Sequence, residues 1–428
     1  MHKKCLIVLF LCIPAFLVFS KESQAMPNFA RKYGADCSMC HTAVPKLNSL
    51  GYEFRLAGYR LPSGIGEAEE AFKLGDFFAA RLQEQFTYKH HNDAAPGKDF
   101  NSNQLEFKEF TIYPLTGAWG KYFASLGEFS MSPDDVFEIE NAFVRGVYGG
   151  ETGWAQARIG VMHPWEGFGA SDRPISLSRP LFQKVPAVGS PFFLWNLDEV
   201  AAEVGYHFAK TETTVAARVS NGILWKEDGS GKAEPAQGGE LTKPGNVTGR
   251  NDKSFQFFAN QFFAEESAVS LYFYRGVVPF PDPNHIPAAP VTTRDTFWRL
   301  AAYANYFVLP EKLNLLAGYE RGHDSLDNSS VSTPDGAQVG SQVGSSEGVF
   351  GEVNFHVTPQ LAFAARYDWY DPSKDVSHNS QTAFTFAGNW RIWGGLQFIG
   401  EFQHKDADRA AGGTNKDDSL QARLIFIW

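Results

Sequence analysis

Strict alternation of apolar and polar residues, which recurs from about residue 76 to the last residue, is the feature that most constrains the fold. Val349, Val353 and Phe355, for example, alternate with Glu352 and Asn354. Successive side chains of a β-strand point to opposite faces, so a period of two predicts strands with one apolar and one polar face. The alternation alone fits a soluble β-sandwich as well as a membrane-spanning barrel.

The number of alternating segments and the lengths of their connections favour the barrel. Short connections, such as 116–121, 210–212 and 310–312, alternate along most of the chain with long polar ones, such as 165–197 and 227–253. Short turns at one rim and long loops at the other are typical of outer-membrane barrels, and an even strand count puts both barrel ends at the short-turn, periplasmic rim. The long loops either fold over the mouth or lie in the lumen. The sixteen expected strands are centred near residues 83, 109, 126, 142, 158, 203, 219, 259, 274, 302, 318, 352, 366, 387, 401 and 423.

Both ends of the chain carry features of exported bacterial proteins. Lys3 and Lys4 precede an apolar run over 5–19, and small residues precede residue 26, which is the layout of a cleaved secretory signal peptide over residues 1–25. A membrane anchor is the alternative, but this run is short for a helix that spans a bilayer. The last alternating strand ends in Trp428 and resembles the assembly signal of bacterial outer-membrane proteins. We therefore expect an outer-membrane location, with lipid around the barrel.

The composition excludes several other classes of protein. Hydrophobic residues make up 43% of the 428 residues, which argues against disorder. Charged residues make up 20%, too many for a helical membrane bundle. The formal net charge of −10 argues against a nucleic-acid partner, which would need a basic face.

The segment Cys37-Ser38-Met39-Cys40-His41 has the C-x-x-C-H pattern of c-type haem attachment. Two thiols at this spacing each add to a haem vinyl group, and the next residue presents its imidazole to the iron. A zinc site usually needs a second cysteine pair, a thioredoxin-like pair needs a βαβ context, and a disulfide closing so small a loop would stabilise little. We therefore expect Cys37 and Cys40 to bind one covalent haem c and His41 to ligate its iron.

The residues around this motif form a small segment, 26–75, which is marginal in size for an independent fold. We expect it to be α-helical, to pack against the barrel, and to contain a helix that starts at Pro45 with Leu47, Leu50 and Phe54 on one stripe. The sixth iron ligand is left open, and a five-coordinate iron is an alternative. A Met ligand would raise the haem potential. The candidates are Met26, His90, His91, Met131, Met162 and His163.

Residues 26–41, with 45–47 and 51–59, resemble the fused cytochrome–porins of iron(II)-oxidising bacteria. The residue match covers about 26–60, whereas the architecture matches over the whole chain. The resemblance implies that Cys37 and Cys40 are the thioether anchors and His41 the proximal iron ligand. It also implies that an electron passes from extracellular Fe(II) to a periplasmic c-type cytochrome.

Together, these features predict a signal peptide over 1–25, a monohaem cytochrome c segment over 26–75 and an all-β, 16-stranded antiparallel transmembrane barrel over 76–428. The haem segment is expected on the periplasmic side or in the lumen. The expected activity is one-electron transfer, at most an outer-sphere Fe(II) oxidase, with no catalytic side chain. Two alternatives remain: outward electron transfer to an extracellular metal, and a diffusion porin with a haem plug. The direction of electron flow, the potential, the oligomeric state and the openness of the pore are not encoded in any motif.

Overall fold

The computed structural model describes residues 27–67, 73–93, 99–133, 137–163, 165–166, 169–170, 174–185, 199–222, 224–227, 233–236, 253–264, 266–281, 291–325, 331–332, 338–339, 344–393, 395–409 and 412–428. The expected signal peptide and Met26 lie outside these residues. None of the helices in the described part is long and apolar enough to cross a bilayer.

The N-terminal part contains short helices and one small hairpin. The hairpin pairs His41 with Leu47 and Ala43 with Lys46. These elements are α2 (Pro27–Tyr33), η1 (Cys37–Met39), β1 (His41–Ala43), β2 (Lys46–Leu47), α3 (Ser49–Leu56), η2 (Pro62–Gly64) and η3 (Leu74–Phe77).

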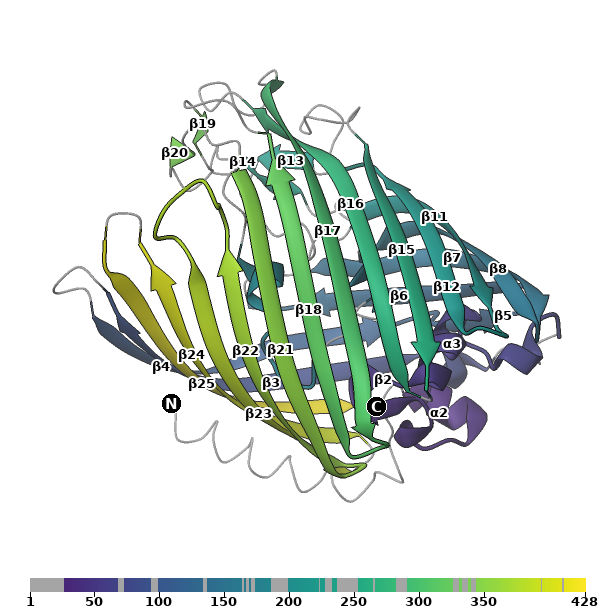
Figure 1. Cartoon of the computed structure of the whole chain (residues 1–428). Coiled ribbons are helices and arrows are strands. Elements are labelled where there is room, and N and C mark those ends of the chain that lie inside the picture. Colours follow the sequence, from purple (N-terminus) through teal and green to yellow (C-terminus); the bar gives the residue numbers. More distant parts are fainter. Residues whose placement is uncertain are drawn as a thin grey trace.

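Sixteen antiparallel strands in the described residues form the wall of a closed barrel (Figure 1). The barrel closes between β25 and β3, where Ile427 pairs with Arg81 and Lys416 with Asn92. Each expected strand centre falls within a wall strand, so the predicted 16-stranded barrel is confirmed. The wall strands are β3 (Ala79–Asn92), β4 (Phe100–Tyr113), β6 (Phe123–Met131), β7 (Glu138–Gly150), β8 (Gly153–Met162), β11 (Glu199–Phe208), β12 (Thr213–Ser220), β15 (Ser254–Phe263), β16 (Ser267–Pro281), β17 (Val291–Leu309), β18 (Leu313–Asp324), β21 (Gly344–Thr358), β22 (Leu361–Asp371), β23 (Gln381–Trp393), β24 (Leu396–Asp408) and β25 (Thr414–Ile427).

The two faces of the wall have the reverse polarity of a soluble sandwich. Val353 and Phe355 point outward and are 45% and 49% exposed, whereas Glu352 between them is 2% exposed and faces the lumen. Val204 is 63% exposed beside Glu203 at 2%. A surface band of exposed apolar side chains around a polar interior is the arrangement of a barrel that faces lipid. The soluble sandwich is thereby excluded.

Two local predictions are wrong in detail. The expected helix from Pro45 begins instead at Ser49, because Lys46–Leu47 pairs with β1 and Asn48 caps the helix by accepting a hydrogen bond from the Gly51 N–H. The connection 116–121, expected as a tight turn, contains the short strand β5 (Gly117–Trp119), which pairs with β6. A short break after β4 separates β5 from it, and Pro114 in that break has no N–H to donate to a ladder.

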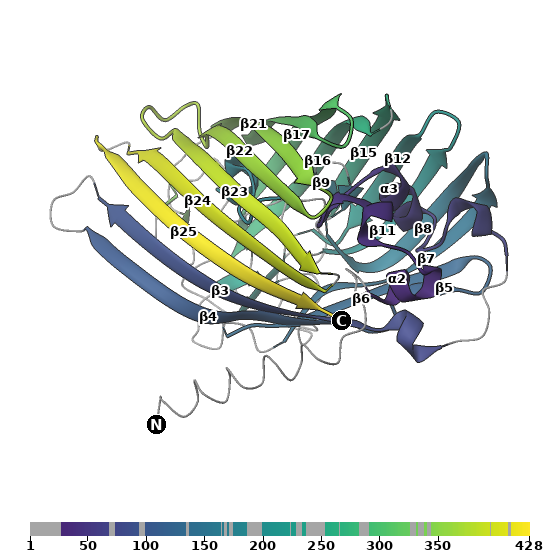
Figure 2. The same cartoon turned by 90° about the horizontal axis from the view of Figure 1, so that it is seen from below.

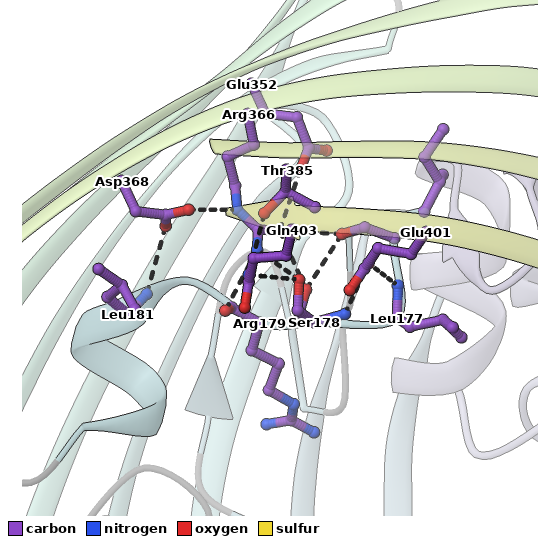
Figure 3. Close-up of polar contacts among 12 residues, drawn as sticks. Leu177, Ser178, Arg179, Leu181, Glu352, Arg366, Asp368, Thr385, Glu401 and Gln403 are labelled. Atoms are coloured by element: carbon purple, nitrogen blue, oxygen red, sulfur yellow. Dashed lines mark hydrogen bonds and ion pairs between the residues drawn. The ribbon is translucent and has the colours of Figure 1, made fainter. Parts of the chain in front are cut away.

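Residues 174–185 of the long connection between β8 and β11 contact the inner side of the wall and include α4 (Leu181–Lys184) (Figure 3). Glu401 of β24 accepts hydrogen bonds from the Leu177 and Ser178 N–H groups at 2.7 and 2.9 Å. Arg366 of β22 donates to Ser178 Oγ at 2.8 Å and to the Arg179 carbonyl at 3.2 Å. This stretch therefore lies in the lumen.

Other short elements are β9 (Trp165–Glu166), β10 (Gly169–Ala170), β13 (Leu224–Glu227), β14 (Ala233–Ala236), β19 (Val331–Ser332) and β20 (Gln338–Val339).

Candidate haem site

The C-x-x-C-H motif is folded tightly around η1. Asp36 begins the turn, and its Oδ1 accepts hydrogen bonds from the N–H and the hydroxyl of Ser38 at 2.9 and 2.8 Å. The Cys40 N–H donates to the Cys37 carbonyl at 3.2 Å, which fixes the two cysteines one turn apart. No disulfide joins them, and burial raises the pKa of Cys40 to about 11. Cys40 is therefore present as a thiol, the form whose S–H bond adds across a vinyl double bond.

The imidazole of His41 is oriented by its backbone neighbour. Its Nδ1 lies 3.1 Å from the carbonyl oxygen of Pro45. Desolvation lowers the pKa of His41 to about 4, so the ring is neutral at physiological pH. A carbonyl only accepts hydrogen bonds, so the single ring proton is on Nδ1 and the lone pair is on Nε2. That is the tautomer which a metal-ligating histidine needs.

Helix α3 packs directly against the motif. The Asn48 side chain donates to the Met39 carbonyl at 3.0 Å, and its backbone N–H donates to the Cys40 carbonyl at 3.0 Å. A Cβ on Gly51 would lie 2.1 Å from the Cys40 carbonyl oxygen, a distance that backbone atoms cannot tolerate. Glycine at position 51 therefore allows α3 to hold the motif in place.

We expect Gly51→Ala to disturb this contact strongly. Because the obstacle is backbone, either α3 or the motif must shift, at a cost of about 1–3 kcal/mol. The haem content per folded barrel, measured by haem absorbance after purification, should fall. Gly64→Ala is the matched control, since nothing lies within 4 Å of a Cβ at that position. Equal haem content in the two variants would contradict the role given to Gly51.

The segment is fastened to the barrel wall by polar contacts around most of the circumference. They lie at the end of the barrel with the short turns, where Figures 1 and 2 show α2 and α3. The contacts join Lys46 Nζ to Asn305 Oδ1 (3.0 Å), the Ser49 N–H to Glu266 Oε2 (2.8 Å), Glu53 Oε1 to His207 Nε2 (3.4 Å), Arg60 Nη2 to the Phe123 carbonyl (2.7 Å), Arg391 Nη2 to Asp36 Oδ1 (3.3 Å) and Asn389 Nδ2 to the Val44 carbonyl (2.8 Å).

A cavity lies between the motif and the remaining sector of the wall. Cys37, Cys40 and His41 line it from the segment, and β3, β4, β6, β24 and β25 line it from the barrel. Ser176 and Leu177 of the inward stretch border it as well. The apolar part of its lining includes Phe29, Leu47, Phe54, Leu126, Ile399, Ile425 and Ile427, and the polar part of the wall includes Arg81, Gln83, Tyr113, Glu128, Gln397 and Arg423.

The donor set and the lining fit a covalent haem c. Two thiols and a neutral imidazole with its lone pair on Nε2 face one cavity. Porin lumens are usually polar, yet three isoleucines of the closing strands line this one beside the motif. A flat apolar group with one polar edge matches such a lining.

Five of the six candidates for the distal ligand lie away from this cavity. His90 and His91 are near the far end of β3, where their Nδ1 atoms contact Asn101 and Asp417. Met162 is fully buried in a cluster with Phe54 and Tyr59. Met131 and His163 are also absent from the described lining, so the structure places none of these five candidates at the cavity. Met26 lies outside the described residues.

The sequence analysis missed the residues that the barrel contributes to the site. Ile425 and Ile427 face the lumen, so β25 is apolar on both faces over 424–428. That departure from alternation was the available signal, because a lumen face of a barrel is normally polar. No local pattern in the sequence indicates that His41 lies at the same cavity as wall residues beyond 390.

Neither the protein-family models nor the curated proteins contain a match to this chain. Among solved structures, the chain is similar to the anion-selective porin from Comamonas acidovorans (TM-score 0.53, 9% identity, covering 82% of this chain and 98% of that one). It is also similar to OmpT of Vibrio cholerae in its trimer form (0.52, 10%, 82% and 98%) and to the outer membrane channel DcaP of Acinetobacter baumannii (0.51, 14%, 82% and 96%). At these identities the likeness concerns the fold, and the chain has a porin-like β-barrel fold.

Proposed function

We propose that the protein is an outer-membrane electron conduit that takes one electron from extracellular Fe(II) and delivers it to a periplasmic c-type cytochrome. The bound haem c supplies the one-electron chemistry. One observation carries this proposal: Cys37, Cys40 and His41 line a single cavity inside the lumen of a porin-like barrel. A redox group held there bridges part of an otherwise insulating wall about 25 Å tall.

The position of the segment supports contact with a periplasmic partner at one end of the barrel and with the iron donor from the other end. Short turns face the periplasm in barrels of this kind, and the segment is fastened at that end, within reach of a soluble periplasmic partner. The iron donor, on the other side, reaches the cavity from the lumen. There Ser176 and Leu177 border the cavity, so the inward stretch 174–185 lies between the mouth and the motif.

A diffusion porin is the second candidate, since the three solved structures above share the barrel fold and one is described as an anion-selective porin. The contacts of Lys46, Ser49, Glu53 and Arg60 with the wall argue against free diffusion, because the segment occupies the short-turn end of the lumen. Outward electron transfer to an extracellular metal would use the same site. It would differ from the proposed inward transfer in the potential of the haem.

The test is to incubate purified, haem-loaded protein in liposomes with Fe(II) outside and to follow the absorbance of reduced haem. We expect reduction in the wild-type protein and its loss in His41→Ala, which removes the iron ligand. If external Fe(II) reduces no haem while His41→Ala conducts solutes as the wild type does, the porin function is favoured. If reduced protein instead passes electrons to external Fe(III), the flow is outward.

A further inference from the structure

We propose that Arg81 binds a propionate group of the haem and thereby raises the haem potential. This inference rests on the proposed function, because it presupposes the covalent haem at Cys37 and Cys40. It concerns a residue of the barrel wall, which no motif in the sequence points to. Arg81 is on β3, near the end of the barrel where the N-terminal segment is fastened.

The guanidinium of Arg81 is only partly satisfied by the protein. Its Nη2 donates to Glu109 Oε1 at 2.5 Å and to Thr111 Oγ1 at 3.0 Å. Its Nε is buried and has no hydrogen-bond partner among the described residues, and Arg81 lines the same cavity as the motif. A buried N–H without an acceptor is costly, so this atom indicates a ligand that supplies one.

The chemistry of a c-type haem identifies that acceptor. In a haem c held here, the vinyl groups would be bonded to the two cysteines, and the propionates lie at the opposite edge of the macrocycle. The cysteines belong to the N-terminal segment, and Arg81 belongs to the barrel wall that lines the same cavity. A carboxylate is the acceptor that a guanidinium binds most strongly, through its planar set of N–H donors.

Among the charged side chains of the wall at this cavity, Arg81 is the best partner for a propionate. Arg423, the other wall arginine at the cavity, donates from Nε to Gln85 at 2.7 Å and from Nη1 to Gln83 at 3.3 Å. Glu128 accepts hydrogen bonds from Tyr113 and Asn141 at 3.1 and 2.8 Å, and its Oε1 lies 3.9 Å from Arg81 Nη2, beyond hydrogen-bond distance. Of the wall side chains that line the cavity, Arg81 therefore combines a positive charge with an unused buried donor.

The sign of the effect follows from charge. Reduction adds one electron to the haem, and a nearby positive charge favours the reduced state. Removing that charge therefore lowers the midpoint potential. Loss of the hydrogen bond should also move the propionate bending band in the resonance Raman spectrum, which a purely structural role in the wall would not do.

The experiment compares Arg81→Gln, Arg81→Lys and the double variant Arg81→Gln/Glu109→Gln with wild type in the purified, haem-loaded protein. We expect a lower potential and a shifted propionate band in Arg81→Gln. Arg81→Lys keeps the charge, so its potential should stay near wild type while the band shifts. The double variant also removes the charge of Glu109, the carboxylate that Arg81 Nη2 contacts at 2.5 Å, so it should fold even if the single variant does not, and its band should still shift.

Arg299→Gln is the matched control. Arg299 is a lumen arginine paired with Asp324 at 2.8 Å and is absent from the described lining of the haem cavity, so potential and band should be unchanged. A wild-type potential and band in the haem-loaded Arg81 variants would overturn this inference alone. A wild-type protein without covalent haem would overturn the proposed function and this inference together.

Discussion

We expect that replacing both Cys37 and Cys40 by alanine abolishes the proposed covalent haem attachment and, with it, all reduction by Fe(II). Both cysteines line the cavity, and η1 with its Asp36 cap holds them one turn apart. Without them the cofactor has only the Nε2 atom of His41 to bind it. Intact-mass spectrometry of the exported chain should show the added mass of haem in wild type and none in the double variant.

Met39→Leu is the matched control for this loss. Met39 lies between the two cysteines and lines the same cavity, yet its position between the anchors keeps it from the distal face of the iron. We expect full attachment and normal Fe(II) reduction in this variant. Haem mass retained by the double-alanine protein, or absent from wild type, would contradict the site. Heat-modifiable mobility on gels would verify that each barrel is folded.

The barrel could be predicted because its determinants are local and repeat. Each wall strand alternates by itself, as Glu203 beside Val204 illustrates, and the turns between strands are set by nearby residues. The motif was equally local, since Cys37, Cys40 and His41 are adjacent in sequence and their chemistry depends on spacing. The five residues 37–41 were therefore enough to predict the part of the candidate site that the N-terminal segment contributes.

The other half of the site depends on contacts between residues far apart in the chain. Asn389 illustrates this, since its Nδ2 donates both to the Val44 carbonyl of the segment and to the Ile175 carbonyl of the inward stretch, at 2.8 and 3.1 Å. No periodic pattern in the sequence relates positions 44, 175 and 389. The misplaced start of the helix at Pro45 has the same origin, because the hairpin with β1 competes with helix propensity there.

Deleting residues 27–67 should open the lumen to ions. In the intact protein the segment contacts strands from β6 round to β24, and the haem cavity occupies the sector that it leaves. Its removal would expose Glu266, Asn305 and Arg145, which water in the lumen can solvate, so the barrel should still fold. In planar bilayers we expect discrete channel openings from the deletion variant and few or none from wild type.

The double-alanine variant separates the contribution of the segment from that of the haem. It keeps Lys46, Ser49, Glu53 and Arg60, whose contacts fasten the segment to the wall, and loses only the attachment of the cofactor. The pore should therefore remain closed, because the contacts between the segment and the wall are made by the polypeptide and not by the haem. Equal conductance in the deletion variant and wild type would mean that the inward stretch 174–185 closes the pore, or that the segment leaves it open. In either case solute diffusion would have to be judged separately from electron transfer.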